Sequence, residues 1–118
     1  MRILIIEDNR DAAESLRLLM EMKGHEVMVA CSGPEGVIFA AEFLPTVVLS
    51  DIGLPGLDGF DVAREIRRNE DLDETKLIAI TGYGSEEYRQ RAHKSGFDYF
   101  LAKPADAEAL LELLGANL

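Results

Sequence analysis

The stretch that decides the fold is Thr46-Val-Val-Leu-Ser-Asp51, followed directly by Ile52-Gly-Leu-Pro-Gly-Leu-Asp-Gly59. Apolar, mostly β-branched residues lead straight into a carboxylate, and a loop rich in glycine and proline comes next. A short apolar run bounded by turn residues predicts a buried strand rather than a helix. Such strands belong to parallel sheets that are covered on both faces. Asp51 should therefore stand at the carboxyl end of a buried strand, where open α/β sheets bind their ligands.

The same unit, a short apolar run followed by a helical stretch, occurs five times along the chain. Strands are expected at 2–6, 26–30, 46–51, 77–80 and 98–101, and helices are expected after caps at Asn9 or Asp8, Ser32, Ser85 and Asp106, with a further helix from Phe60 to about Arg68. This alternation predicts an α/β fold: one parallel sheet with right-handed crossovers and helices on both faces, in three layers. The 118 residues suit one domain, spanning 1–118.

Local patterns predict how one helix and one connection pack. Ser32-Gly-Pro-Glu35 has the form of a capping box, and the helix it opens should bury Val37, Ala40, Ala41 and Leu44 at helical spacing. The connection 69–75 is acidic and polar, so it is expected on the surface. Solvated faces are also expected to carry the arginines Arg64, Arg67, Arg68, Arg89 and Arg91.

The helix expected between Ser85 and Ser95 is the least apolar of the five. Only Tyr88 and Ala92 offer apolar surface there. Burial stabilises roughly in proportion to apolar area, so this helix should be the most weakly held and the first to shift.

Composition restricts the partners and the compartment. The net charge is −10, from 12 basic and 22 acidic residues, and nucleic acids and anionic membranes both attract basic faces. Neither is therefore expected as a direct partner. No segment has the length of a membrane span, and acidic residues occur too early for a secretory signal peptide. The chain is expected in the cytoplasm, with Cys31 as an unreactive structural thiol.

Side chains suited to phosphoryl chemistry stand at the ends of four predicted strands: Glu7, Asp8, Asp51, Thr81 and Lys103. The carboxyl ends of parallel strands meet at one edge, so we expect these groups to converge. Each close pair of carboxylates costs about 1–4 kcal/mol at ~4 Å, which a hard divalent cation such as Mg²⁺ would offset. A lysine ammonium suits a phosphoryl oxygen. The set predicts that Asp51 accepts a phosphoryl group.

In these residues the chain resembles the receiver domains of two-component response regulators, over essentially its whole length. The matching pieces are Glu7-Asp8-Asn9, Ser50-Asp51 with Leu54-Pro55-Gly56-Leu57-Asp58-Gly59, Thr81-Gly82 and Lys103-Pro104. The resemblance implies a flavodoxin-like sheet with strand order 2-1-3-4-5. It also implies that a histidine kinase or a histidine phosphotransfer protein donates the phosphoryl group from a phosphohistidine to Asp51.

The same resemblance implies a metal site around the phosphoacceptor. Asp8 and Asp51 would be Mg²⁺ ligands, the Gly53 carbonyl would be a further ligand, and Glu7 would contact the ion through water. The family often has an aspartate where Glu7 stands, which should alter the water-mediated contact more than direct ligation.

The resemblance further implies a switch. Lys103 would pair with the phosphate, Thr81 would move toward it, and Phe100 would swing inward behind Thr81. The face formed by helix 85–95, strand 98–101 and the last helix would then bind a different partner or a second copy. The Lys103–Pro104 peptide should be cis.

Some details of the sequence resemble receivers attached to hybrid histidine kinases, namely the run after Ser50 and Thr81-Gly-Tyr-Gly84. Phe100 replaces the commoner tyrosine, so a signal made through a phenol hydroxyl is absent. Gly53 and Tyr83 flank the site where other members carry polar groups that orient an attacking water. Slow self-dephosphorylation is therefore expected.

Two other functions compete with a phosphoacceptor switch, which is not itself a conventional enzyme. A phospho-aspartate phosphatase of the haloacid-dehalogenase type also uses Asp, Thr and Lys, but its nucleophile follows the first strand as Asp-x-Asp, whereas this chain has Glu7-Asp8-Asn9. A flavodoxin-like nucleotide binder needs a phosphate loop after the first strand, which the sequence lacks. Steady hydrolysis of a phosphate monoester would favour the phosphatase, and one stoichiometric acyl phosphate would favour the switch.

Overall fold

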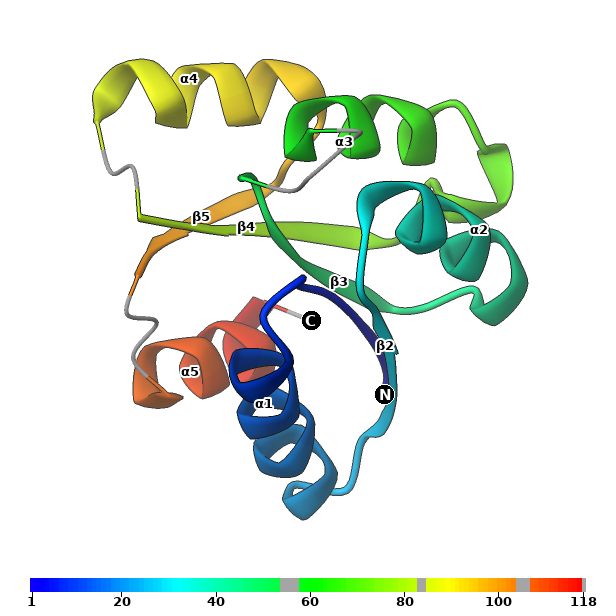
Figure 1. Cartoon of the computed structure of the whole chain (residues 1–118), viewed down its shortest axis with the longest axis vertical. Helices are drawn as coiled ribbons and strands as arrows, with labels where there is room; N and C mark the ends of the chain where they lie inside the picture. The colour runs from blue at the N-terminus through cyan, green and yellow to red at the C-terminus, as the bar shows by residue number, and fades with distance from the viewer. Residues whose placement is uncertain (54–57, 83–84, 104–106, 118) are drawn as a thin grey trace.

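The computed structural model describes residues 1–53, 58–82, 85–103 and 107–117. Strands and helices alternate through this part of the chain (Figure 1). The strands are β1 (Arg2–Ile6), β2 (Glu26–Ala30), β3 (Val47–Asp51), β4 (Lys76–Thr81) and β5 (Tyr99–Ala102). The helices are α1 (Arg10–Met22), α2 (Gly33–Phe43), α3 (Gly59–Arg67), α4 (Glu86–Ser95) and α5 (Ala107–Asn117), with a short 3₁₀ turn η1 (Glu70–Leu72) before β4.

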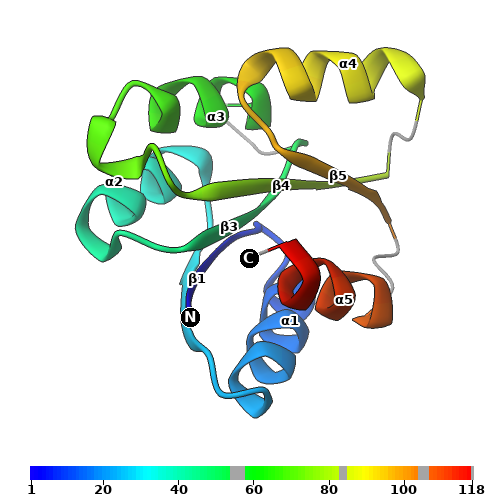
Figure 2. The same cartoon turned by 180° about the vertical axis from the view of Figure 1, so that it is seen from behind.

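All five strands are parallel and lie in the order β2-β1-β3-β4-β5, which confirms the expected fold class. Figures 1 and 2 show α1 and α5 on one face of the sheet and α2, α3 and α4 on the other. The pairing sets Ser50 beside Ile6 and Asp51 beside Ile80. The ends of β1, β3 and β4 therefore meet at one edge of the sheet.

Each face of the sheet has its own hydrophobic core, because alternate side chains of a strand point to opposite faces. On the side of α1 and α5 the buried strand residues are Ile3, Ile5, Val47, Leu49, Ile78 and Ile80. On the side of α2, α3 and α4 they are Leu4, Ile6, Ala30, Val48, Leu77 and Ala79. Strands buried on both faces are rich in apolar residues throughout, which is the pattern that the sequence shows.

The helices begin at polar caps. The Asn9 side chain accepts a hydrogen bond from the Ala12 amide (3.0 Å), and the Ser85 hydroxyl accepts one from the Tyr88 amide (3.3 Å). These bonds satisfy amides that a helix leaves unpaired at its start. The predicted cap of α5, Asp106, lies outside the described residues.

The prediction for α2 was wrong in part. Ala40 is buried, as predicted, but Ala41 and Leu44 are exposed, and the helix also buries Gly33, Gly36 and Phe43. A glycine is needed within this face, because a Cβ at position 36 would lie 2.5 Å from the Ile6 side chain. The backbone of α2 thus packs directly on β1, and this rotates the buried face away from Ala41.

The capping box also differs from its expected form. The Ser32 hydroxyl accepts a hydrogen bond from the Glu35 amide, as predicted. The Glu35 carboxylate, however, accepts its bond from the Cys31 amide (2.9 Å) rather than from the Ser32 amide.

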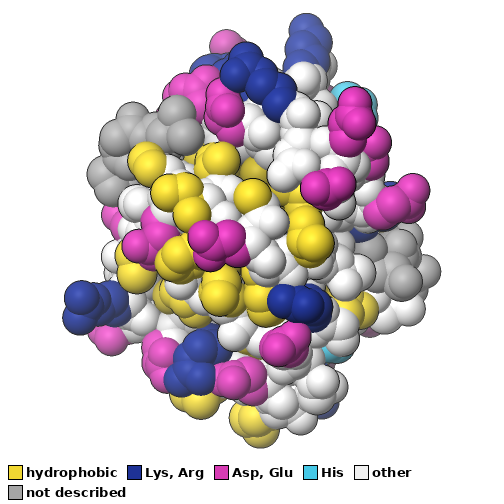
Figure 3. Space-filling view, turned by 90° about the vertical axis from the view of Figure 1, so that its right-hand side faces the viewer, with side chains coloured by type: hydrophobic (Ala, Val, Ile, Leu, Met, Phe, Trp, Pro, Cys, Tyr) yellow, Lys and Arg dark blue, Asp and Glu magenta, His cyan; other side chains and the backbone are white. Residues whose placement is uncertain are grey.

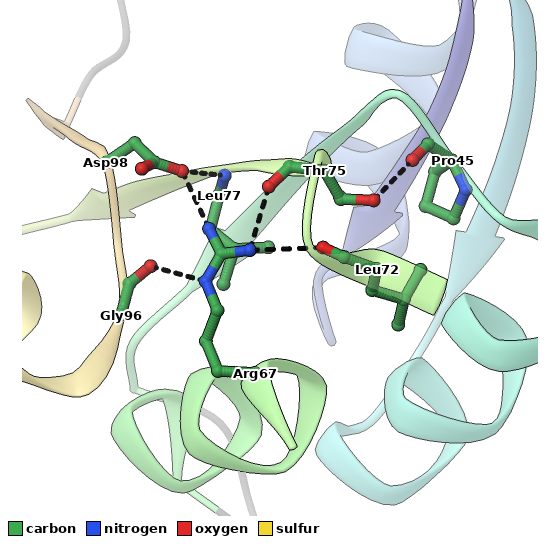
Figure 4. Close-up of polar contacts among 7 residues, drawn as sticks. All are labelled: Pro45, Arg67, Leu72, Thr75, Leu77, Gly96 and Asp98. Atoms are coloured by element: carbon green, nitrogen blue, oxygen red, sulfur yellow. Dashed lines mark hydrogen bonds and ion pairs between the residues drawn. The ribbon is translucent and has the colours of Figure 1, made fainter. Parts of the chain in front are cut away.

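The connection before β4 is more buried than its polar sequence predicts. Leu72 and Thr75 are both buried, and the Thr75 hydroxyl donates a hydrogen bond to the Pro45 carbonyl (2.7 Å). Arg67, expected to be solvated, donates to the carbonyls of Leu72 and Thr75. Its contacts, drawn in Figure 4, join segments far apart in the sequence.

The surface carries both charged and apolar regions. Figure 3 shows hydrophobic side chains gathered on the side of the molecule where the edge strand β2 lies, with charged side chains among and around them. Val27, Met28 and Val29 of β2 are only partly buried. None of the described helices is both long enough and apolar enough to cross a membrane.

Candidate functional site

The predicted polar residues lie at the expected edge of the sheet. Glu7 and Asp8 follow β1, Asp51 ends β3, Thr81 ends β4 and Lys103 follows β5. A cleft at this edge is lined by Glu7, Asp8, Asp51 and Lys103 together with residues of β1, β3, β4 and α1. Residues far apart in the sequence are therefore neighbours here because each lies next to the end of a strand.

Lys103 is the cation of the site. Its Nζ donates to Asp51 Oδ2 (2.9 Å) and to Glu7 Oε1 (3.3 Å). Burial alone would lower the pKa of Lys103, but the hydrogen bonds and negative charges of Asp51 and Glu7 outweigh burial and raise that pKa above its usual value. Lys103 therefore remains an ammonium at neutral pH.

The three carboxylates outnumber this one cation. Glu7, Asp8 and Asp51 each offer an oxygen, and these oxygens lie within 4.8 Å of one another. Glu7 is only 5% exposed, and its Oε2 is buried with no hydrogen-bond partner among the described residues. Burial, followed by the neighbouring Asp51 carboxylate, raises the pKa of Glu7, although Lys103 acts in the opposite direction.

The donor set fits a hard divalent cation. Mg²⁺ binds carboxylate oxygens together with water or phosphate oxygens, and the unpartnered Glu7 oxygen is an acceptor that such an ion or its water could satisfy. Asp51 is held on both of its oxygens, because the Gly53 amide donates to Oδ1 (3.1 Å) while Lys103 contacts Oδ2. These two contacts orient the carboxylate without fully covering it, since 13% of the Asp51 side chain remains exposed.

Thr81 and Phe100 occupy different environments. Thr81 is 1% exposed, and its carbonyl accepts a hydrogen bond from the Lys103 amide (2.7 Å), which ties the last residue of β4 to the lysine. Phe100 is partly buried, and the guanidinium of Arg89 lies 5.0 Å from the centre of its ring. The ring of Phe100, which is a residue of β5, thus lies against α4.

Some predicted features lie outside the described residues. They are the loop Leu54-Pro55-Gly56-Leu57, Tyr83 and the Pro104 side of the expected cis peptide. The roles of Gly53 as a carbonyl ligand and of Glu7 as a water-mediated contact stay predictions.

Gly59 was quoted from the sequence only as part of the motif after Asp51, and its packing role beside the site was not predicted. A Cβ at this position would lie 2.4 Å from the Ile52 Cα and 2.8 Å from the Asp51 carbonyl oxygen, and the Gly59 amide donates to the Ile52 carbonyl (2.8 Å). The start of α3 therefore lies directly against the segment that carries Asp51. The glycine following the cap residue Asp58 was the available signal.

Comparison with known protein families and relatives agrees with this geometry. The family model described as "response regulator receiver domain" matches residues 3–115. Protein PilH of Pseudomonas aeruginosa is 34% identical over 117 residues, which cover 99% of this chain and 97% of PilH.

Solved structures give the same result. The chemotaxis protein CheY4 of Vibrio cholerae has a TM-score of 0.93 and 26% identity, covering 99% of this chain and 98% of CheY4. The receiver domain of the sensor histidine kinase PA1611 of Pseudomonas aeruginosa has a TM-score of 0.88 and 29% identity, covering 96% of this chain and 93% of that domain. That structure has a magnesium ion coordinated in its active-site cleft.

Proposed function

This chain belongs to the response regulator receiver domain family, and on that premise we propose that Asp51 accepts a phosphoryl group from a phosphohistidine while Mg²⁺ is bound at the carboxylate cluster. Receiver domains signal through a phosphoaspartate, and histidine kinases or phosphotransfer proteins supply the phosphoryl group. The observation that carries the assignment to Asp51 is the contact of its Oδ2 with Lys103 Nζ (2.9 Å), beside two further carboxylates. These contacts support the proposal, because they bring the proposed nucleophile, a cation suited to the transferred group and carboxylates suited to a metal to one point.

The reaction forms an acyl phosphate. An oxygen of Asp51 attacks phosphorus, the P–N bond to the donor imidazole breaks, and the imidazole leaves with the bonding electron pair and takes up a proton. Mg²⁺, when bound by Asp8, Asp51 and the Gly53 carbonyl, supplies charge neutralisation for the phosphoryl oxygens. Catalysis of this kind depends mainly on positioning and electrostatics.

The residues of the chain do the positioning. The Gly53 amide holds Oδ1 of Asp51, which leaves Oδ2, now paired with Lys103, as the oxygen that we expect to attack. Lys103 then transfers its contact from the carboxylate to a phosphoryl oxygen. Such a transfer requires little rearrangement, because a lysine ammonium has three donors on a flexible stem.

The phosphorylated state is proposed to be read through Thr81 and Phe100. The Thr81 hydroxyl donates to a phosphoryl oxygen, Phe100 moves inward behind it, and the face formed by α4, β5 and α5 changes its partner. The hydrogen bond from the Lys103 amide to the Thr81 carbonyl supports a coupled response, since it joins the two residues that would contact the phosphoryl group.

Dephosphorylation is proposed to be slow, because Gly53 offers no side chain that could orient a water for attack on the acyl phosphate. A receiver in which polar groups flank the phosphoacceptor provides the comparison. A phosphoprotein lifetime as short as that of a fast chemotaxis receiver would contradict this expectation.

The experiment that tests the function is phosphorylation by a small acyl phosphate with Mg²⁺, followed by location of the added mass. We expect one phosphoryl group per chain, on Asp51, and none on an Asp51→Asn variant. Asp73→Asn is the matched control, because Asp73 is an exposed aspartate after η1 that is absent from the site. Labelling of the Asp51→Asn variant at the wild-type level would reject the assignment.

A further inference from the structure

Arg67, the last residue of α3, joins four segments of the chain (Figure 4). Its Nε donates to the Gly96 carbonyl (3.0 Å), and its NH1 donates to the carbonyls of Leu72 (3.2 Å) and Thr75 (2.9 Å). Its NH2 forms an ion pair with Asp98 Oδ2 (2.7 Å). One guanidinium therefore holds the end of α4, the start of β5 and the turn before β4.

Asp98 extends this network into the sheet. The oxygen that pairs with Arg67 also accepts a hydrogen bond from the Leu77 amide (2.9 Å), and the Asp98 amide donates to the Leu77 carbonyl (2.8 Å). Asp98 is thus bonded to β4 through both its backbone and its side chain. These bonds fix the position of Asp98 relative to β4, and Asp98 is the residue directly before β5.

Gly96 lies in close contact with the Arg67 side chain. Its φ is +117°, a conformation that favours glycine. A Cβ there would also lie 2.6 Å from the Arg67 Cγ. The backbone of α4 therefore ends directly against the Arg67 side chain, with no room for a larger residue.

The two halves of α4 are held differently. In the C-terminal half, Ala92 and Ser95 are buried, as is Phe97 just beyond the helix, and the Phe97 amide donates to the Ala92 carbonyl (3.0 Å). From Ser85 to Arg91 none of the residues is buried, and Tyr88 is only partly buried.

Aromatic contacts link the N-terminal half and the middle of α4 to α3. The Tyr88 ring lies 5.9 Å from that of Phe60, and the guanidinium of Arg91 lies 4.2 Å from the Phe60 ring centre. Stacking and cation–π contacts tolerate sliding more readily than a set of short, directional hydrogen bonds does.

We propose that Arg67 anchors the C-terminal end of α4, so that when Asp51 is phosphorylated the helix rotates about this end and its N-terminal turn moves. The proposal rests on the proposed function of Asp51. A helix of this length is about 15 Å long, so a rotation of roughly 10° would move its start by ~3 Å while Gly96 stays in place.

The fixed end is the one far from the phosphoacceptor. Thr81 ends β4, and α4 begins five residues later, at Glu86. The half of α4 that lacks buried residues is therefore the half that follows the site in sequence. A change at Thr81 reaches this half first, whereas the anchor keeps Asp98 and the start of β5 in register with β4.

Hydrogen exchange, measured segment by segment on the full chain with and without acetyl phosphate and Mg²⁺, tests the anchor. In the wild type we expect phosphorylation to change exchange at 86–90 and to leave 92–98 unchanged. A phosphorylation-dependent change that is uniform along α4, or largest at 92–98, would overturn the proposal.

Arg67→Lys is the informative variant, because it keeps the positive charge near Asp98 but cannot reach all four acceptors at once. We expect the amides of Leu77 and Phe97 to exchange roughly tenfold faster or more in this variant, and the response to phosphorylation to spread along the whole helix. Arg68→Lys is the matched control, since Arg68 is exposed and its ion pair is with Glu65, three residues earlier in the chain. Wild-type protection in Arg67→Lys would overturn the anchor.

The same samples separate this proposal from the proposed function. The mass of each sample reports whether Asp51 carries a phosphoryl group. Absence of that mass would reject the function of Asp51, and with it the triggered rotation. Exchange of the unphosphorylated variants would still decide whether Arg67 is the anchor. Circular dichroism checks that Arg67→Lys folds, and Asp98→Asn, which weakens the same ion pair from the other side, should reproduce its exchange pattern.

Discussion

The site at Asp51 and the network at Arg67 both place one cation among several oxygen atoms, yet they differ in how completely their polar groups are paired. Arg67 meets four acceptors at hydrogen-bond distance. Lys103 faces three clustered carboxylates, contacts two of them, and leaves Glu7 Oε2 buried without a described partner. In a structural network each polar group has a hydrogen-bond partner, whereas a ligand site leaves some charges and acceptors unpaired until the ligand binds.

Removal of the Arg67 side chain should have the largest effect on stability. Arg67→Ala would leave carbonyls and the Asp98 carboxylate without their charged donor, so we expect the free energy of unfolding to fall by about 2–4 kcal/mol. Urea denaturation measures this loss. Arg68→Ala should change stability by no more than ~0.5 kcal/mol. Equal losses of unfolding free energy in Arg67→Ala and Arg68→Ala would mean that the Arg67 network does not stabilise the fold.

The close contact at Gly96 should be the next most sensitive feature. Gly96→Ala combines an unfavourable φ with a Cβ placed 2.6 Å from Arg67, and we expect a loss of roughly 2–3 kcal/mol. Gly24→Ala is the matched control, because Gly24 also has a positive φ (+89°), but a Cβ there would meet no atom within 4 Å. Thermal or urea denaturation should therefore show a clearly smaller loss for Gly24→Ala.

At Asp51, the proposed phosphoacceptor, removal of charge should raise stability rather than lower it. Asp51→Asn relieves repulsion among the carboxylates, and without Mg²⁺ we expect the unfolding free energy to rise by about 1 kcal/mol. The stabilisation that Mg²⁺ gives should become smaller, because one ligand is lost. Melting curves with Mg²⁺ and with a chelator measure both effects, and unchanged melting in both conditions would contradict the carboxylate cluster.

The pH dependence should show the smallest effect. Because the pKa of Glu7 is raised in the folded state, the folded chain binds more protons than the unfolded chain above about pH 4.5. The contribution of Glu7 to stability is therefore present below that pH and is lost as the pH rises through its folded-state pKa. Without Mg²⁺, the unfolding free energy of Glu7→Gln minus that of the wild type should increase as the pH rises from about 4.5 through the folded-state pKa of Glu7. A difference that does not change with pH would reject the raised pKa.

The difference between the two regions also explains what could be predicted from the sequence. Asp51, Thr81 and Lys103 each lie next to the end of an apolar run, so a local pattern indicated their place at the sheet edge. Arg67 has no such signal, because its partners are mostly backbone carbonyls, which any residue provides. Its role depends on where α3 ends relative to Gly96, and only the packed structure determines that.

The buried face of α2 was mispredicted for a related reason. Hydrophobic spacing assigns a helix face by its side chains, and Gly36 has none. It contributes to the interface by letting the backbone approach Ile6. Patterns of apolar side chains therefore find strands and their ends more reliably than they find close backbone contacts.

The most direct test of the central claim is the Mg²⁺ dependence of acyl-phosphate labelling, followed over time with the wild-type chain. If the carboxylates bind the metal and Asp51 is the acceptor, labelling should rise to one phosphoryl group per chain with Mg²⁺, stay on Asp51, and nearly stop when the metal is chelated. Labelling at the same rate without Mg²⁺, or at a residue away from the carboxylate cluster, would contradict the account.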